Sequence, residues 1–392
     1  MMSSESRVRP EIELLLCCAR TRLDEACSAR LRRLVAEELD WPYLLEEAEE
    51  HGVKPLLYWQ LKSHCRPEVP QLWMERLEEA FRQNARRNLC LVAELIKIVE
   101  LFRRNAILAI PHKGPILAER VYGDLALRQF VDLDIVVRQR DVAKVHELMA
   151  SQGFQAEFSG GGAHVVPGQY VFTRESGRIV VEIHSERTLR YFPTPLDLDA
   201  MSDRLETIPL DGSQVQTFSA EQALPILCVH GSKHFWERLA WVCDIAEMAQ
   251  APRGMDWEAA LGNARRLGAE RMVSLGLYLA RDLLGAALPQ EVWQRVQSDR
   301  VAEFLAAQVR ALSFSGTRSE LGVAQRFGFR VRMRGNTWEG FRYALRLVAA
   351  PTEEDWSQLH FRKPLPAFYA VLRPLRLLRK YGLRNKTSHR QA

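Results

Sequence analysis

Apolar residues recur at three- and four-residue spacing through the first hundred residues, and this spacing predicts amphipathic helices. The predicted helices cover Glu11–Leu23, Ala29–Leu39, Trp41–His51 and Gln71–Arg104. Asp40 is a suitable N-cap for the third of them, and Gly52 is a suitable stop after it. We therefore expect a helical region over residues 1–105.

The pattern changes after Asn105, where helical spacing gives way to short apolar runs and alternation. Strands are predicted for Ala106–Ile110, Phe130–Val137, Gln169–Thr173, Ile179–His184 and Glu206–Pro209, and helices for Pro115–Tyr122 and Val142–Gln152. Gly177 lies in the short polar segment between the third and fourth strands and indicates a β-hairpin. Residues 106–215 are thus predicted to form a core of strands and helices.

Helical spacing returns after Ser219, which is a good N-cap. The predicted helices are Ala220–Lys233, Glu237–Ala249, Trp257–Arg266, Glu270–Leu284 and Glu291–Leu312. We expect a second helical region over residues 216–316 and a basic helical tail over residues 317–392. Because the strands cluster in one part of the chain, the predicted fold class is α+β, with a small mixed sheet flanked by N- and C-terminal helical regions.

Composition changes this picture little. The chain is 47% hydrophobic and 26% charged, and no stretch approaches 18 uncharged apolar residues, so no transmembrane segment is predicted. The seven cysteines are odd in number and include no C-x-x-C pair, which favours a reducing compartment over a disulfide framework. The N-terminus lacks the layout of a signal peptide. We therefore predict a cytoplasmic protein.

Positive charge is concentrated at the C-terminal end. From Arg318 onward there are 16 Lys and Arg against 5 Asp and Glu, although the net charge of the whole chain is only +5. Residues 361–392 contain nine basic residues and no acid, interleaved with leucines. Such a segment can contact an anionic membrane surface or a nucleic acid, or it can pack its leucines on the protein and leave its arginines in solvent.

Two acidic residues on one predicted strand are the first candidates for chemistry. Side chains alternate along a strand, so Asp132 and Asp134 project from the same face, about 7 Å apart, while Leu133 points into the core. Carboxylates this close repel each other, and a divalent cation is the usual compensation. Oxygen ligands suit Mg²⁺ or Mn²⁺, which bridge to triphosphate oxygens. An exposed acidic strand face is the alternative interpretation.

The turn His112-Lys113-Gly114 joins the first predicted strand to the helix Pro115–Tyr122. A helix N-terminus favours an anion, Gly114 lets the backbone approach closely, and Lys113 adds a positive charge. The turn therefore predicts a phosphate-binding site just upstream of the acid pair. An ordinary strand-to-helix turn, which also often contains glycine, is the alternative.

The acid pair and the glycine turn belong to a longer series of motifs. These are Pro111-His-Lys-Gly114-Pro-Ile-Leu-Ala118, Tyr122-Gly-Asp124, Arg128, Val131-Asp-Leu-Asp-Ile-Val-Val137, Val181-Glu-Ile-His184, His230-Gly-Ser-Lys-His-Phe-Trp236, Arg238-Leu-Ala-Trp241, Asp244-Ile-Ala246, Leu372-Arg-Pro-Leu-Arg376 and Lys380-Tyr-Gly382. The series resembles the polymerase-β-type nucleotidyltransferase superfamily, and within it an uncharacterised bacterial nucleotidyltransferase family. Two features depart from the superfamily pattern: Lys113-Gly114 stands where Gly-Ser is usual, and Tyr122–Arg128 is an insertion.

The resemblance implies a third carboxylate on a neighbouring strand, and Glu182 is the candidate. In the strand Ile179–His184, Glu182 and His184 share the face opposite to Val181 and Ile183. Glu182 is expected to complete the metal site or to serve as general base, and His184 is a second candidate base. A glutamate at a hairpin edge is the alternative.

Arg128, His230 and Lys233 are expected to contact the nucleotide or the acceptor. Arg128 precedes the acid strand, and the other two share the helix Ala220–Lys233. Asp244 is placed to fix one of that helical pair, whereas Asp124 is expected to fix the insertion. His230 and His234 are spaced like a zinc pair, but no third ligand is evident, so a polar seam between helices is the main alternative.

The sequence and the resemblance together predict metal-dependent transfer of a nucleoside monophosphate from an NTP to an acceptor hydroxyl or amine, with release of pyrophosphate. The metal is Mg²⁺ or Mn²⁺. The acceptor, a small molecule, peptide or saccharide, leaves no motif. Two alternatives stay open: an inactive nucleotide-binding or scaffold protein, and a binder of nucleic acid or of the inner membrane surface through residues 361–392.

Overall fold

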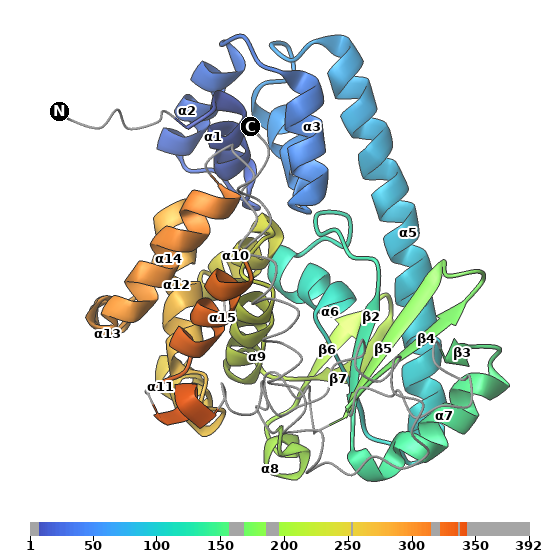
Figure 1. Cartoon of the computed structure of the whole chain (residues 1–392). Coiled ribbons are helices and arrows are strands. Elements are labelled where there is room, and N and C mark those ends of the chain that lie inside the picture. The colour runs from blue at the N-terminus through green and yellow to red at the C-terminus, as the bar shows by residue number, and fades with distance from the viewer. Residues whose placement is uncertain are drawn as a thin grey trace, which may run out of the picture.

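A computed structural model describes residues 8–156, 168–185, 196–251, 254–314, 322–335 and 338–342. These residues form an α+β fold, as predicted, in which a small mixed sheet lies between helices from both parts of the sequence (Figure 1). Residues 343–392, which include the predicted anionic-surface contact at 361–392, lie outside the described residues. No described helix is long and apolar enough to cross a membrane.

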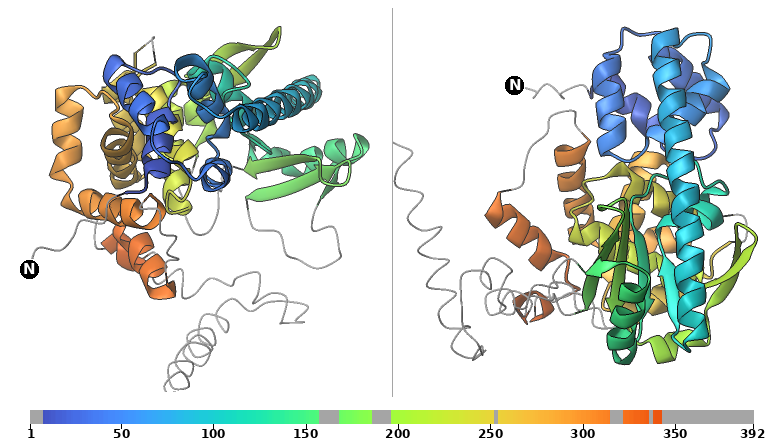
Figure 2. Two further views of the ribbon diagram at one scale, coloured as in Figure 1. Left: turned by 90° about the horizontal axis from the view of Figure 1, so that it is seen from above. Right: turned by 90° about the vertical axis from the view of Figure 1, so that its right-hand side faces the viewer.

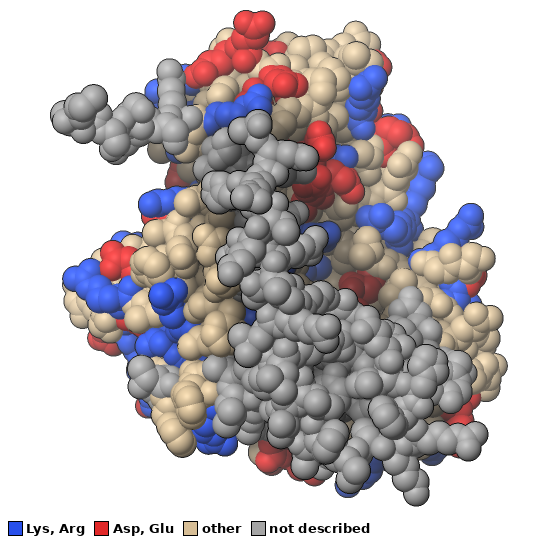
Figure 3. Space-filling view, in the orientation of Figure 1, with Lys and Arg blue, Asp and Glu red and all other residues tan. Residues whose placement is uncertain are grey.

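The N-terminal helices form a bundle from which one long helix runs down beside the sheet (Figure 2). They are α1 (Pro10–Cys18), α2 (Glu25–Val35), α3 (Trp41–Glu50), α4 (Lys54–His64) and α5 (Gln71–Arg104). Asp40 caps α3 as predicted, because its side chain accepts a hydrogen bond from the Tyr43 amide. Acidic and basic side chains are interspersed over this bundle in the view of Figure 3.

The sheet has five strands in the order β1-β2-β5-β4-β3. The strands are β1 (Ala109–His112), β2 (Leu133–Val137), β3 (Gln155–Ala156), β4 (Gln169–Arg174) and β5 (Ile179–Ser185). Strands β2 and β5 are parallel, and the other neighbouring pairs are antiparallel. The predicted hairpin is therefore confirmed as β4–β5. The parallel register sets Asp134 opposite Glu182 and Val136 opposite His184.

Short helices and a second hairpin complete the α/β part. Between the strands lie α6 (Gly114–Leu117), the one-turn π-helix η1 (Ala118–Tyr122), the 3₁₀ turn η2 (Gln139–Asp141), α7 (Val142–Ser151) and α8 (Leu198–Ser202). Strands β6 (Glu206–Leu210) and β7 (Ser213–Thr217) form a separate antiparallel pair.

The later helices pack beside the sheet and beneath the N-terminal bundle (Figure 1). They are α9 (Ala220–Lys233), α10 (Leu239–Ala249), α11 (Trp257–Arg266), α12 (Glu270–Leu284), α13 (Gln290–Ser298), α14 (Arg300–Ser313) and α15 (Val323–Arg332). A capping box at Ser219 and Gln222 starts α9 at the predicted residue.

Two large hydrophobic cores hold these parts together, beside a smaller cluster around Ile110, Val136 and Phe218. One joins the N-terminal bundle to α9–α14. The other joins the C-terminal half of α5 to one face of the sheet, where Leu95 and Phe102 pack with Leu133, Ile135 and Val181. Helix α5 therefore contributes to both cores, and the division of the chain at residues 105, 215 and 316 stays a prediction.

Some of the predicted element bounds were wrong. Strand β2 begins at Leu133 rather than Phe130, and Val131, near the start of the predicted strand, is 53% exposed. The predicted helix Glu291–Leu312 is two helices, because the Asp299 side chain accepts hydrogen bonds from the amides of Val301 and Ala302 and starts a new one. Helix α4 lies inside the predicted helical region, but it was given no bounds of its own.

Candidate active site

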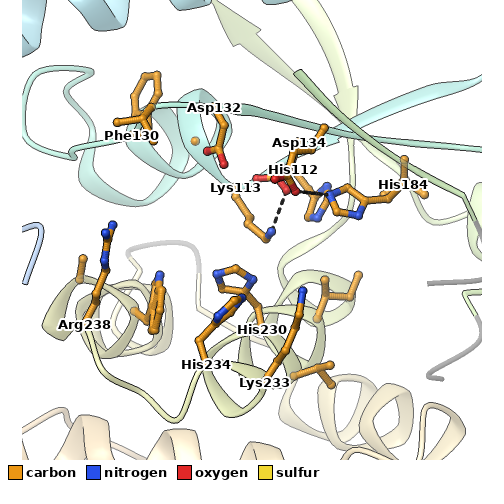
Figure 4. A pocket seen from close by; sticks show the side chains of 18 of the residues that line it. His112, Lys113, Phe130, Asp132, Asp134, His184, His230, Lys233, His234 and Arg238 are labelled. Atoms are coloured by element: carbon orange, nitrogen blue, oxygen red, sulfur yellow. Dashed lines mark hydrogen bonds and ion pairs between the residues drawn. The ribbon is translucent and has the colours of Figure 1, made fainter. Parts of the chain in front are cut away.

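One cavity of about 340 Å³ lies between the sheet and helices α9 and α10. All the predicted site residues line it, namely Lys113, Gly114, Arg128, Asp132, Asp134, Glu182, His230 and Lys233. Figure 4 shows two facing walls: the carboxylates of Asp132 and Asp134 on the sheet side, and His230, Lys233 and Arg238 on the helical side. The fold thus sets acidic side chains opposite basic ones.

Asp134 and Glu182 stand side by side because β2 and β5 are parallel and pair these two residues. Alternation along β5 places His184 on the same face as Glu182. One donor atom from each of the three side chains lies within 4.8 Å of the other two. Two carboxylates and an imidazole are ligands that a divalent cation accepts, so these side chains fit a metal ion.

Asp132 lines the same cavity, but it does so from a bend and not from the predicted strand. It lies in the bend just before β2, so it does not share a strand face with Asp134, although its side chain also points into the cavity (Figure 4). Burial, followed by the negative charge of Asp134, raises the pKa of Asp132 to about 6. The repulsion expected between the two carboxylates is therefore present in the fold.

Two basic side chains neutralise Asp134. Lys113 Nζ donates a hydrogen bond to Asp134 Oδ1 over 2.8 Å, and His184 Nε2 lies 2.8 Å from the same oxygen. Burial alone would raise the pKa of Asp134, but Lys113 and His184 hold it well below its usual range. Burial opposes protonation of His184, yet its contacts with Asp134 and Glu182 raise its pKa. Asp134 is therefore an ionised carboxylate with the Lys113 ammonium and the His184 imidazole already beside it.

Glu182 is held by its own neighbours on the sheet. Gln169 Nε2 donates to Glu182 Oε2 over 2.8 Å, and His184 Nε2 lies 3.5 Å from that oxygen. Burial would raise the pKa of Glu182, but the hydrogen bond with His184 lowers it overall. The carboxylate is thus ionised and aimed at the cavity by two side chains of the same sheet.

The turn before α6 has an unusual backbone. Lys113 has φ 61° and ψ −149°, a conformation that glycine adopts far more readily than other residues. Gly114 allows a close approach, since a Cβ there would lie 3.4 Å from the carbonyl oxygen of Asp132. Helix α6 has four residues, so its dipole is small, and Lys113 provides most of the positive charge at this turn.

Arg128 lines the cavity, but its guanidinium is committed to Asp244 on α10. Nε and Nη2 donate to the two carboxylate oxygens, each over 2.8 Å, and Tyr122 Oη donates to Oδ1 over 2.7 Å. Burial would lower the pKa of Arg128, but Asp244 raises it, so the guanidinium stays charged. Asp244 was expected to fix a residue of α9, and that expectation was wrong.

Asp124 fixes the insertion as predicted, because its side chain accepts a hydrogen bond from the Ala126 amide.

The helical wall combines basic groups with aromatic rings. His230, His234 and Trp241 lie in mutual ring contact, with centroids 4.9–5.3 Å apart. Burial, followed by the charge of Lys113, lowers the pKa of Lys233 to about 8. Burial, followed by the charge of Lys233, lowers the pKa of His234 to about 4. In the described part of the chain, no third metal ligand joins His230 and His234.

Several cavity residues were given no role from the sequence. They are His112, Gln169, His234, Arg238 and Trp241. His112 is the most notable, because its Nδ1 is buried with no hydrogen-bond partner in the described structure. Burial, followed by the charge of Lys113, lowers its pKa to about 3, so it is a neutral imidazole. All but Gln169 lie inside the quoted motifs, which was the one signal that could have found them.

No curated protein matches this chain. Among solved structures, an antigenic nucleotidyltransferase-like protein from Paracoccidioides brasiliensis is similar: it is 17% identical, the match covers 53% of this chain and 95% of that one, and the TM-score is 0.36. Residues 37–285 match the family described as uncharacterised nucleotidyltransferase, and this match includes all the cavity residues. The chain therefore belongs to the uncharacterised nucleotidyltransferase family.

Proposed function

We propose that the protein transfers a nucleoside monophosphate from an NTP to an acceptor hydroxyl or amine and releases pyrophosphate, with a divalent metal as cofactor. The observation that carries this proposal is the single cavity in which ionised carboxylates face basic side chains. A metal–triphosphate complex needs both kinds of side chain. Carboxylates bind the cation, and basic groups neutralise the phosphate charge that the cation does not.

Asp132, Asp134 and Glu182 are the proposed metal ligands. Asp134, Glu182 and His184 hold donor atoms within 4.8 Å of one another and Asp132 lines the same cavity, so His184 is proposed as a fourth donor. Carboxylate ligands favour Mg²⁺ or Mn²⁺, and an imidazole ligand would favour Mn²⁺ of the two. When bound, the metal would stabilise the charge that develops on the transferring phosphate.

Lys113, Gly114, His230 and Lys233 are the proposed nucleotide contacts. Lys113 and Lys233 come from opposite walls, so a triphosphate between them would meet positive charge from two directions. Arg128 acts indirectly in this proposal. Its ion pair with Asp244 joins the segment before β2 to α10 and so fixes the spacing of the two walls.

The reaction follows from these positions. The acceptor oxygen or nitrogen attacks the α-phosphorus, the bond from that phosphorus to the bridging oxygen breaks, and pyrophosphate leaves with the bonding electrons. The acceptor loses a proton, and Glu182 is the proposed base because it is an ionised carboxylate on the cavity face. Positioning and charge stabilisation supply the rate enhancement, without a covalent enzyme intermediate.

The test is to follow separately the α- and γ-phosphates of the NTP. The protein is incubated with Mg²⁺, fractionated cell extract as a source of acceptors, and ATP or GTP labelled at one position or the other. We expect the α label in a product and the γ label in pyrophosphate. Transfer of the γ label would mean a phosphotransferase and would contradict the proposal. Metal-dependent binding with neither label transferred, over all fractions, would favour the inactive nucleotide-binding alternative.

A further inference from the structure

Lys113 occupies a position that nucleotide binding alone does not explain. A lysine that only contacts phosphate could come from an unstrained backbone, yet Lys113 adopts φ 61° and ψ −149° between β1 and α6. This backbone directs its side chain into the acidic wall, where it is 12% exposed and its ammonium touches Asp134, which is 5% exposed. The strain therefore serves to place a positive charge against a proposed metal ligand.

The contact is one that a metal ion would have to break. Asp134 Oδ1 accepts from Lys113 Nζ at 2.8 Å and also lies 2.8 Å from His184 Nε2. Two lone pairs on one oxygen are thus already engaged, inside a cavity where charges interact more strongly than in water. A free divalent cation that binds this carboxylate would have to break the ion pair between Lys113 and Asp134. The free energy lost with that ion pair would weaken the binding of the cation.

A triphosphate changes this balance, because it offers the ammonium another anionic partner. Lys113 and Lys233 repel each other across the cavity, and the pKa of Lys233, lowered first by burial and then by Lys113, reflects this repulsion. A polyanion placed between the two walls would remove the repulsion and draw Lys113 away from Asp134. The freed carboxylate would then be available to the cation that accompanies the nucleotide.

We propose that Lys113 is the resident counter-ion of the metal site, moving from Asp134 to the triphosphate so that the cation and the nucleotide bind synergistically. This inference rests on the proposed function and describes how cation binding at that site is regulated. Its consequence is that the carboxylate site binds a free cation weakly and a nucleotide-bound cation tightly.

The test measures Mn²⁺ binding to the full-length protein by electron paramagnetic resonance, with and without the non-hydrolysable analogue α,β-methylene-ATP. For the wild type we expect the analogue to tighten Mn²⁺ binding by roughly tenfold or more. For Lys113→Gln we expect tight Mn²⁺ binding without the analogue, and little further gain from it. Lys233→Gln is the matched control, because it makes the same charge change on the opposite wall, whereas the hydrogen bond to Asp134 comes from Lys113.

One result would overturn the inference alone: Lys113→Gln binding Mn²⁺ no tighter than Lys233→Gln does, while the wild type still binds Mn²⁺ and the analogue synergistically. If Lys113→Gln does not fold, the pair Lys113→Met and Lys233→Met makes the same comparison. Failure of the proposed function looks different, since the wild type would then show no metal-dependent binding of the analogue at all.

Discussion

Arg128 and Asp244 form a two-point ion pair in the interior, 116 residues apart in sequence, with both N–O distances at 2.8 Å. Tyr122 donates a hydrogen bond to the same carboxylate, and Arg128 and Asp244 are 8% and 2% exposed. Arg128 precedes β2, the strand that carries Asp134, and Asp244 belongs to the helix that carries Trp241. The pair therefore links the two walls of the cavity at a largely buried point.

Replacing Asp244 with Asn should destabilise the protein strongly. The change leaves the Arg128 guanidinium buried without a counter-charge, and breaking such a pair costs about 3–5 kcal/mol. Urea denaturation followed by circular dichroism measures the loss. Asp282→Asn is the control, because its ion pair with Arg310 is exposed and should contribute about 0–1 kcal/mol. Equal losses in the two variants would show that the buried pair is not a structural link.

Gly231 should tolerate no side chain, although it lies in a helix where alanine is normally the better residue. A Cβ there would lie 2.7 Å from the ring of Trp236, which is fully buried. Gly231→Ala should therefore lower the free energy of unfolding by about 1–3 kcal/mol. Gly262→Ala, in α11 with no atom near the added Cβ, should leave it unchanged or raise it by up to about 1 kcal/mol. Thermal unfolding of both variants tests whether the free energy of unfolding falls in Gly231→Ala and does not fall in Gly262→Ala.

The local sequence pattern was enough to predict some elements of this fold but not others. The bounds of α5, α9 and α12 follow from helical spacing and caps, and these are properties of neighbouring residues. The family resemblance implied a third carboxylate, and alternation along a hairpin strand placed the candidate, Glu182, on the face that lines the cavity. Asp132, by contrast, was placed on a strand that begins only at Leu133, since alternation does not show where pairing starts.

The partners of buried charges were the hardest to predict. Asp244 was assigned to α9 because it is near in sequence, whereas its partner is Arg128, a residue of the distant insertion. In the same way Lys113 was expected to contact a phosphate, and in the fold it forms an ion pair with Asp134. Both contacts depend on tertiary packing, which no local spacing in the sequence encodes.

NTP binding should weaken as the pH rises through about 8. Burial, followed by Lys113, lowers the pKa of Lys233 to about 8, so the ammonium is charged below that pH and neutral above it. A triphosphate favours the charged form, and its affinity should therefore fall by roughly tenfold for each pH unit above the pKa of the complex. Calorimetric titrations with Mg²⁺ at several pH values measure this. Lys233→Arg should bind with a flatter profile, and an unchanged slope in that variant would exclude Lys233 as the titrating contact.

Replacing Glu182 with Gln should weaken the metal site without unfolding the protein. The amide keeps the shape of the side chain and can still contact Gln169, but it removes one of the proposed anionic ligands. We expect Mn²⁺ affinity in the presence of α,β-methylene-ATP to fall by roughly tenfold or more, and nucleotidyl transfer to fall further. Glu175→Gln, exposed in the turn of the same hairpin, should change neither quantity. Normal Mn²⁺ binding by Glu182→Gln would remove Glu182 from the metal site.

The most direct measurement is calorimetric NTP binding, with and without Mg²⁺, to the wild type and to the double variant Asp132→Asn/Asp134→Asn. These two carboxylates face the basic wall of the cavity and are the core of the proposed metal site. We predict Mg²⁺-dependent binding to the wild type and its loss in a double variant that keeps the circular dichroism spectrum of the wild type. Equal binding by both proteins, or binding that is independent of Mg²⁺, would contradict a metal-dependent nucleotidyltransferase site at these residues.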